Sequence, residues 1–76
     1  MACEYGSNLA LAIQLTDGAC KNLRKAVEEV RKTNDPEQLS AIQLTLANHQ
    51  RAIVDMTKWQ TEHQSACESC RDAQRD

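Results

Sequence analysis

Residues 36–74 read PEQLSAIQLTLANHQRAIVDMTKWQTEHQSACESCRDAQ. One row of residues in this stretch recurs at alternating spacings of three and four: Leu39, Ile42, Leu46, His49, Ile53, Met56, Gln60, His63, Cys67, Cys70 and Gln74. This is the a and d spacing of a heptad, which places these side chains along one stripe of an α-helix. We call such a stripe a seam, and we expect a single helix over residues 36–74. A helix of this kind needs a partner against which its seam can pack.

A second row with the same spacing runs through the first half of the chain. Its members are Leu9, Ile13, Thr16, Cys20, Leu23, Val27 and Val30. The row keeps its phase across Asp17 and Gly18, so we expect one continuous helix over residues 7–33, although an interior glycine costs up to about 1 kcal/mol. Ala12, Ala19 and Ala26 flank this seam at intervals of seven residues, and such small side chains let another helix approach closely.

The segment between the two rows carries the signals of a tight turn. Asn34 tolerates the left-handed conformation that ends a helix, and Asp35 is a good N-cap. Pro36 fits a first helical turn, and Gln38 stands at the capping-box position. A loop over residues 34–35 makes the two helices antiparallel neighbours. The sequence therefore predicts an all-α fold, with one helical-hairpin domain over residues 1–76 and a short tail over residues 1–6.

Antiparallel pairing about this turn fixes which residues meet, because the numbers of facing residues sum to about 69. Cys20 then faces His49 with Thr16 one turn away, and these three residues form a polar layer that fixes register rather than a catalytic centre. The second helix is longer than the first. We expect the tail to fold back along its end, which brings Cys3 near Cys67.

The size of the chain predicts self-association. A chain of 76 residues forms a single core that is marginal unless an oligomer, a metal or a disulfide supplements it. Two hairpins packed together give a four-helix bundle that buries both seams and the alanine flank. We therefore expect a homodimer.

Cysteine and histidine residues gather toward the C-terminal end of the second seam. His63, Cys67 and Cys70 share one helical face, and Cys3 can add a fourth ligand from the tail. Three cysteines and one histidine are a ligand set that zinc takes. The prediction that we favour is that they are small seam residues with free thiols, and that folding needs no cofactor. A zinc site, or a disulfide from Cys3 to Cys67 or Cys70, are the alternatives.

Basic residues lie on the outer side of the first helix: Lys21, Arg24, Lys25, Arg31 and Lys32. A dimer of helical hairpins with such a surface resembles, in architecture and length, the Rop-type RNA-binding regulators of plasmids, with NDPEQLSAI (residues 34–42) at the place of their acidic turn. The resemblance implies RNA as an alternative partner. The simpler interpretation is a solvated face, since Lys25–Glu29 and Glu28–Lys32 are i,i+4 pairs.

Apolar side chains outside both seams exceed what two packed helices need. The main ones are Leu11, Leu15, Leu44, Val54 and Trp59. These apolar residues are either buried in an oligomer or form a docking surface for a partner protein. Together with the basic residues Lys21, Arg24 and Lys25 they are the candidate partner-binding residues, and Trp59 is the expected anchor.

Composition narrows the class of function. A net charge of −2 argues against broad electrostatic capture of nucleic acid. The first residues have neither the basic nor the apolar segment of a signal peptide, and the longest apolar stretch is too short to span a membrane. No carboxylate pair, phosphate loop or triad can be assembled. We expect a small cytoplasmic, non-enzymatic protein that acts by protein–protein interaction as a helical homo-oligomer.

Overall fold

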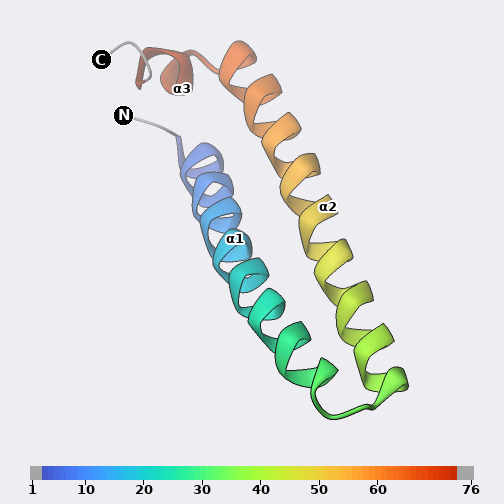
Figure 1. The fold of residues 1–76 in the computed structure, drawn as a ribbon. Helices are drawn as coiled ribbons and strands as arrows, with labels where there is room; N and C mark the ends of the chain where they lie inside the picture. Colours follow the sequence, from blue (N-terminus) through green and yellow to red (C-terminus); the bar gives the residue numbers. More distant parts are fainter. Residues whose placement is uncertain (1–2, 74–76) are drawn as a thin grey trace.

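The computed structural model describes residues 3–73. This part of the chain is helical almost throughout, with α1 over Glu4–Arg31, α2 over Pro36–Ala66 and α3 over Glu68–Ala73. The all-α prediction is confirmed. α1 and α2 lie side by side and run in opposite directions, and α3 lies beyond the N-terminal end of α1 (Figure 1). The molecule is a narrow rod of 52 × 17 × 16 Å.

α1 begins earlier than the sequence pattern predicts. The tail expected over residues 1–6 is wrong from Glu4 onward, because Cys3 serves as the N-cap. Its backbone is extended, with φ −72° and ψ 166°, and its Sγ accepts a hydrogen bond from the Gly6 N–H at 3.3 Å. The Cys3 carbonyl oxygen accepts the Ser7 N–H at 2.9 Å. α1 then continues through Gly18, as its unbroken seam predicts.

The turn between α1 and α2 follows the predicted cap chemistry. α1 ends at Arg31, two residues before the predicted end, and Asn34 takes the left-handed conformation with φ 57°. The Asp35 carboxylate accepts the Gln38 N–H at 3.1 Å, and α2 begins at Pro36 as predicted. The chain therefore reverses over residues 32–35.

The expectation of one helix over residues 36–74 is wrong, because α2 ends at Ala66. Cys67 takes an extended backbone conformation with φ −96° and ψ 116°. Its N–H still donates to the His63 carbonyl at 2.7 Å, while its own carbonyl accepts the Arg71 N–H at 3.0 Å and so starts α3. The break turns α3 away from the axis of α2. Gln74, the last predicted seam residue, lies outside the described residues.

The packed interior of the chain is thin. The buried hydrophobic residues of the described chain are Leu9, Cys20, Val27, Val30 and Cys70. Four of them belong to α1, and α2 contributes none. Packing within one chain therefore leaves most of the seam of α2 partly exposed.

No helix within residues 3–73 combines the length and apolar character that crossing a bilayer requires.

The residues of the predicted polar layer bond within their own helices. The Thr16 hydroxyl donates to the Ala12 carbonyl at 2.7 Å, and the Nδ1 of His49 lies 2.8 Å from the Thr45 carbonyl oxygen. Cys20 is 1% exposed. These two bonds therefore lie within single helices and do not cross the helix pair.

Candidate metal centre

Four side chains, from the start of α1, the end of α2, the break after it and α3, meet at the end of the rod opposite the turn. Cys3 precedes the first turn of α1, His63 lies in the last turn of α2, Cys67 occupies the break and Cys70 lies on α3. The short capped turn fixes α1 and α2 as neighbours, and the break at Cys67 directs α3 back across the start of α1. These are the four residues that the sequence suggested as a zinc set.

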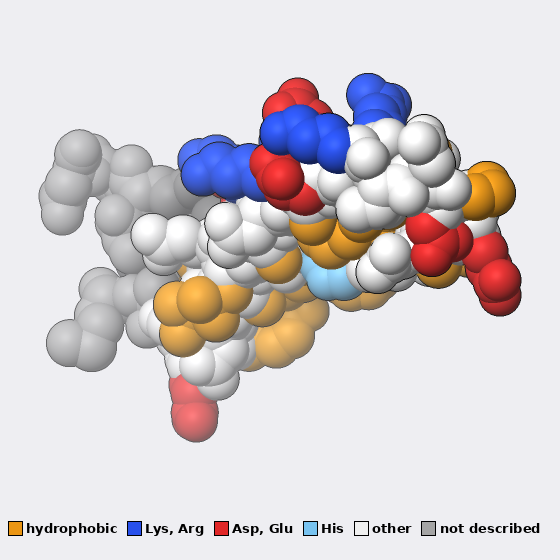
Figure 2. Space-filling view, turned by 60° about the horizontal axis from the view of Figure 1, so that its bottom comes forward, with side chains coloured by type: hydrophobic (Ala, Val, Ile, Leu, Met, Phe, Trp, Pro, Cys, Tyr) orange, Lys and Arg blue, Asp and Glu red, His pale blue; other side chains and the backbone are white. Residues whose placement is uncertain are grey.

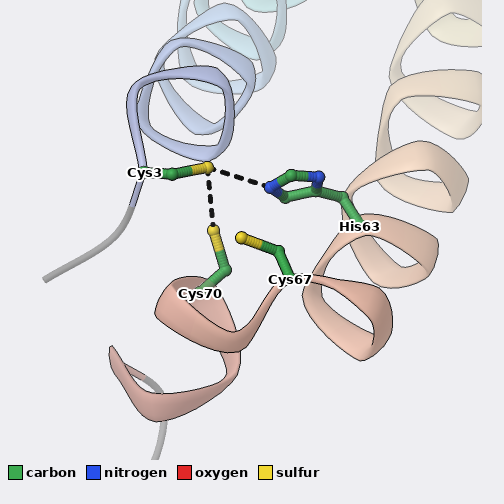
Figure 3. A group of neighbouring side chains, drawn as sticks. All are labelled: Cys3, His63, Cys67 and Cys70. Atoms are coloured by element: carbon green, nitrogen blue, oxygen red, sulfur yellow. Dashed lines mark hydrogen bonds between the residues drawn. The ribbon is translucent and has the colours of Figure 1, made fainter.

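The ligand atoms converge on one point, as Figure 3 shows. The Sγ of Cys3 lies 3.0 Å from the Nε2 of His63 and 3.4 Å from the Sγ of Cys70. One ligand atom from each of the four residues lies within 4.8 Å of all the others. The cluster could therefore hold a metal ion.

The donor set and its size fit a single zinc ion. Zinc in structural sites takes four ligands in a tetrahedron, and three cysteines with one histidine is one of its common sets. Sulfur ligands at about 2.3 Å from the ion lie roughly 3.8 Å from one another. The separations found here, from 3.0 to at most 4.8 Å, bracket that value. An ion can thus be bound with small adjustments of the side chains.

Two residues beside the ligands support the site. Gly6 lies against the cluster, and a Cβ built on it would meet the Cys70 Sγ at 2.6 Å and the Cys3 Sγ at 3.6 Å. The ring of Tyr5 packs edge-on against the His63 ring, with centroids 4.7 Å apart and planes at 67°. Tyr5 therefore holds the imidazole, and the missing side chain of Gly6 gives Cys70 its space.

The environment of Cys3 favours its thiolate form. Hydrogen bonds from the Gly6 N–H, then from His63 and Cys70, lower its pKa from 9.0 to about 6. The pKa of Cys70 is raised: a bond with the Cys3 backbone lowers it, but desolvation and the neighbouring Cys3 and Cys67 sulfurs outweigh that effect. Cys3 is thus the first thiol of the pair to ionise. The thiolate is the form that binds metals.

The environments of the four cysteines differ. All are free thiols; Cys70 and Cys20 are buried, at 4% and 1% exposed, while Cys3 and Cys67 are half-buried. Cys20 lies in the seam of α1 and is not part of the cluster. The chain therefore contains a matched pair of buried cysteines, one inside the cluster and one outside it.

The candidate partner-binding residues lie on the surface. Leu11, Leu15, Leu44, Val54 and Trp59 are all exposed, from 48% for Trp59 to 68% for Val54. Arg24 and Lys25 are exposed as well, and Lys21 pairs with Asp17 at 3.4 Å. In Figure 2 the Lys and Arg side chains lie along the upper edge of the view, and hydrophobic side chains reach the surface below them. The structure brings none of these residues into the cluster.

Gly6 is the functional residue that the sequence pattern missed. The signal was present in its position three residues after Cys3, where a capping side chain meets a backbone N–H.

No protein-family model, curated protein or solved structure matches this chain. The donor atoms themselves define what the cluster can bind, which is a borderline-soft cation that accepts thiolates and imidazole.

Proposed function

We propose that the protein binds one zinc ion through Cys3, His63, Cys67 and Cys70. The observation that carries the proposal is that four ligand atoms, from both ends of the helix pair and from α3, lie within 4.8 Å of one another. Three of these residues share one helical spacing, but Cys3 is 60 residues away from His63 in the sequence. A fourth ligand from so distant a position completes a tetrahedral set.

The proposed role of the ion is structural. A site with four protein ligands leaves no open position for a substrate or for an activated water molecule, in contrast to catalytic zinc sites. The ion would join the start of α1 to the end of α2 and to α3. A chain with five buried hydrophobic residues among those described gains much from such a link, because metal binding adds directly to folding free energy.

Zinc content and chelator-dependent melting test this proposal. Protein purified without chelator should contain one zinc ion per chain by elemental analysis, and a strong chelator should lower its melting temperature by 10 °C or more (on the order of 2 kcal/mol for a chain of this size). Cys70→Ala should lose the zinc, whereas Cys20→Ala, at the equally buried cysteine outside the cluster, should keep it. Zinc-free protein whose melting is unaffected by chelator and by added zinc would overturn the proposal.

A second candidate function is protein–protein interaction as a helical homo-oligomer. It is favoured by the absence of any buried residue in α2 and by the exposed apolar side chains on both long helices. Light scattering of the zinc-loaded protein at micromolar concentration should give about twice the chain mass of 8.5 kDa. A strictly monomeric, folded protein would overturn it.

The RNA alternative has no comparable support. Lys21 of α1 is paired with Asp17, and Lys32, directly after α1, is paired with Glu29, at 3.4 and 3.2 Å. Isolated exposed cations such as Arg24 and Lys25 are ordinary surface residues. We therefore do not extend the proposal to RNA; affinity for RNA that falls steeply with salt would reopen it.

A further inference from the structure

Two of the four proposed ligands have their sulfur atoms in direct contact. The Sγ of Cys3 and the Sγ of Cys70 lie 3.4 Å apart, and the dashed line in Figure 3 joins them. A disulfide joins its sulfur atoms at about 2.05 Å, so these two atoms need to approach by only about 1.4 Å. The free thiols of the chain are therefore held close to bonding distance.

Contacts with α1 and α2 define where the Cys3 sulfur lies. It accepts the Gly6 N–H at 3.3 Å and lies 3.0 Å from the Nε2 of His63. The Cys70 sulfur lies against the backbone of the same glycine, where a Cβ would come within 2.6 Å of it. The missing side chain of Gly6 thus lets both sulfurs occupy the same corner of the cluster.

The cysteines of the cluster differ in their access to solvent. Cys3 is half-buried, whereas Cys70 is 4% exposed. A small oxidant from solvent that reacts with Cys3 therefore finds the Cys70 sulfur already in contact with it. Cys67 is the competing partner for Cys70, because it is half-buried as well, its Sγ lies within 4.8 Å of the other ligand atoms, and it precedes Cys70 by three residues.

We propose that Cys3 and Cys70 form a disulfide when the chain is oxidised by a hydroperoxide, and that this disulfide excludes zinc from the cluster. The second part rests on the proposed zinc site. Cysteine binds a metal as its thiolate, and the sulfurs of a disulfide are no longer thiolates. Oxidation thus removes two of the four ligands and leaves only His63 and Cys67, which are too few for a structural zinc site.

The reaction balances with one molecule of hydroperoxide. The Cys3 thiolate attacks one peroxide oxygen: an S–O bond forms, the O–O bond breaks, hydroxide leaves, and Cys3 becomes a sulfenic acid. The Cys70 thiolate then attacks the Cys3 sulfur, so that the S–S bond forms, the S–O bond breaks and a second hydroxide leaves. Two protons, from the thiols of the zinc-free chain or from solvent when zinc departs, convert both hydroxides to water. The two sulfurs together lose two electrons, and the peroxide gains them.

The disulfide keeps the end of the rod closed after the ion has left. It joins the residue before α1 to α3, which zinc also joins, and it spans 67 positions of the chain. A cross-link over so long a loop removes much of the freedom of the unfolded chain. The oxidised zinc-free protein should therefore melt about 10 °C above the reduced zinc-free protein.

Peptide mapping identifies the bonded pair. The full-length protein, purified without chelator, is treated with one equivalent of hydrogen peroxide, once folded and once in urea, and the remaining thiols are then blocked. Cleavage after glutamate places each cysteine in a peptide of its own: residues 1–4, 5–28, 63–68 and 69–76. In the folded protein, peptide 1–4 should be linked to peptide 69–76, both in the wild type and in Cys20→Ala. In urea, peptide 63–68 should replace peptide 1–4 as the main partner, because only a short loop then has to close.

The same folded samples report on zinc. A chromogenic chelator should detect one zinc ion released for each disulfide formed, and dithiothreitol should restore both the thiols and the binding of zinc. If peptide 63–68 is linked to peptide 69–76 in the folded protein, or if the product is the same with and without urea, the inferred pair is wrong although the zinc site stands. Zinc that stays bound to the fully oxidised protein would overturn the exclusion. Protein that forms the Cys3–Cys70 bond but never contains zinc would support the pair and overturn the proposed function.

Discussion

Gly6 and Cys70 approach each other so closely that no side chain fits between them. A Cβ at residue 6 would lie 2.6 Å from the Cys70 Sγ, a distance that no ordinary contact shows. A side chain at residue 6 would therefore have to move this sulfur, which lies 3.4 Å from the Cys3 Sγ, away from its place in the cluster. The backbone of α1 therefore forms one wall of the metal centre.

Gly6→Ala should weaken zinc binding by at least tenfold, because the new methyl group displaces the Cys70 sulfur from the cluster. The zinc-free variant should be as stable as the wild type or slightly more stable, since alanine favours a helix over glycine by up to about 1 kcal/mol. Competition with a chromogenic chelator measures the affinity. Gly18→Ala is the control: nothing lies within 4 Å of its Cβ, so it should raise stability and leave zinc affinity unchanged.

The ionisation of Cys3 predicts a pH dependence for the zinc-free protein. With its pKa at about 6, Cys3 should be alkylated by iodoacetamide with a midpoint near pH 6, and Cys70, whose pKa is raised, should react only at more alkaline pH. Peptide mass spectrometry separates the two. His63→Ala should move the Cys3 midpoint upward, since it removes one of the hydrogen bonds to the sulfur.

The lowered pKa of Cys3 also predicts how the stability of the zinc-free protein changes with pH. A thiol whose folded-state pKa is depressed stabilises the fold fully above its unfolded value of 9.0, and this contribution is lost as the pH falls toward about 6. Urea unfolding of the zinc-free protein should therefore show stability rising between pH 6 and pH 9. A flat profile in that window, together with slow alkylation of Cys3 at pH 7, would contradict the assigned ionisation.

The cap at the start of α2 predicts a stability change remote from the metal. Asp35→Ala should lower the free energy of unfolding by about 1 kcal/mol, because the Gln38 N–H loses its acceptor. Asp35→Asn should keep most of the stability, since asparagine caps as well. Zinc affinity, measured in the same samples, should be the same in both variants and in the wild type.

His49→Leu should raise the melting temperature of the protein. His49 is half-buried, and its Nδ1 lies within hydrogen-bond distance of the Thr45 carbonyl of its own helix, so leucine adds apolar burial without breaking a bond between helices. Sedimentation of the same variant shows whether His49 also specifies the oligomer, in which case mixed masses should appear. A fall in melting temperature would show that the imidazole has a structural partner.

Local signals in the sequence predicted the turn and the start of α2, because Asn34, Asp35 and Pro36 each act through their own backbone and nearest neighbours. They did not predict the break at Cys67, since a seam pattern records only which side chains share a stripe and continues unchanged through the break. The four ligands could be suggested from spacing and register. The role of Gly6 could not, because it depends on how closely α3 approaches α1.

The contact between Cys3 and Cys70 spans 67 positions of the chain, and this separation indicates when the contact forms during folding. Helices joined by a short turn can form and pair from the turn outward, each step closing only a small additional loop. The two ends of the rod meet last, and in an unfolded chain bringing such distant residues together carries a loop-closure cost that grows with the logarithm of their separation. Zinc should then bind at the end of folding rather than at its start. The rate of zinc uptake would therefore measure the rate at which the ends of the helix pair come together.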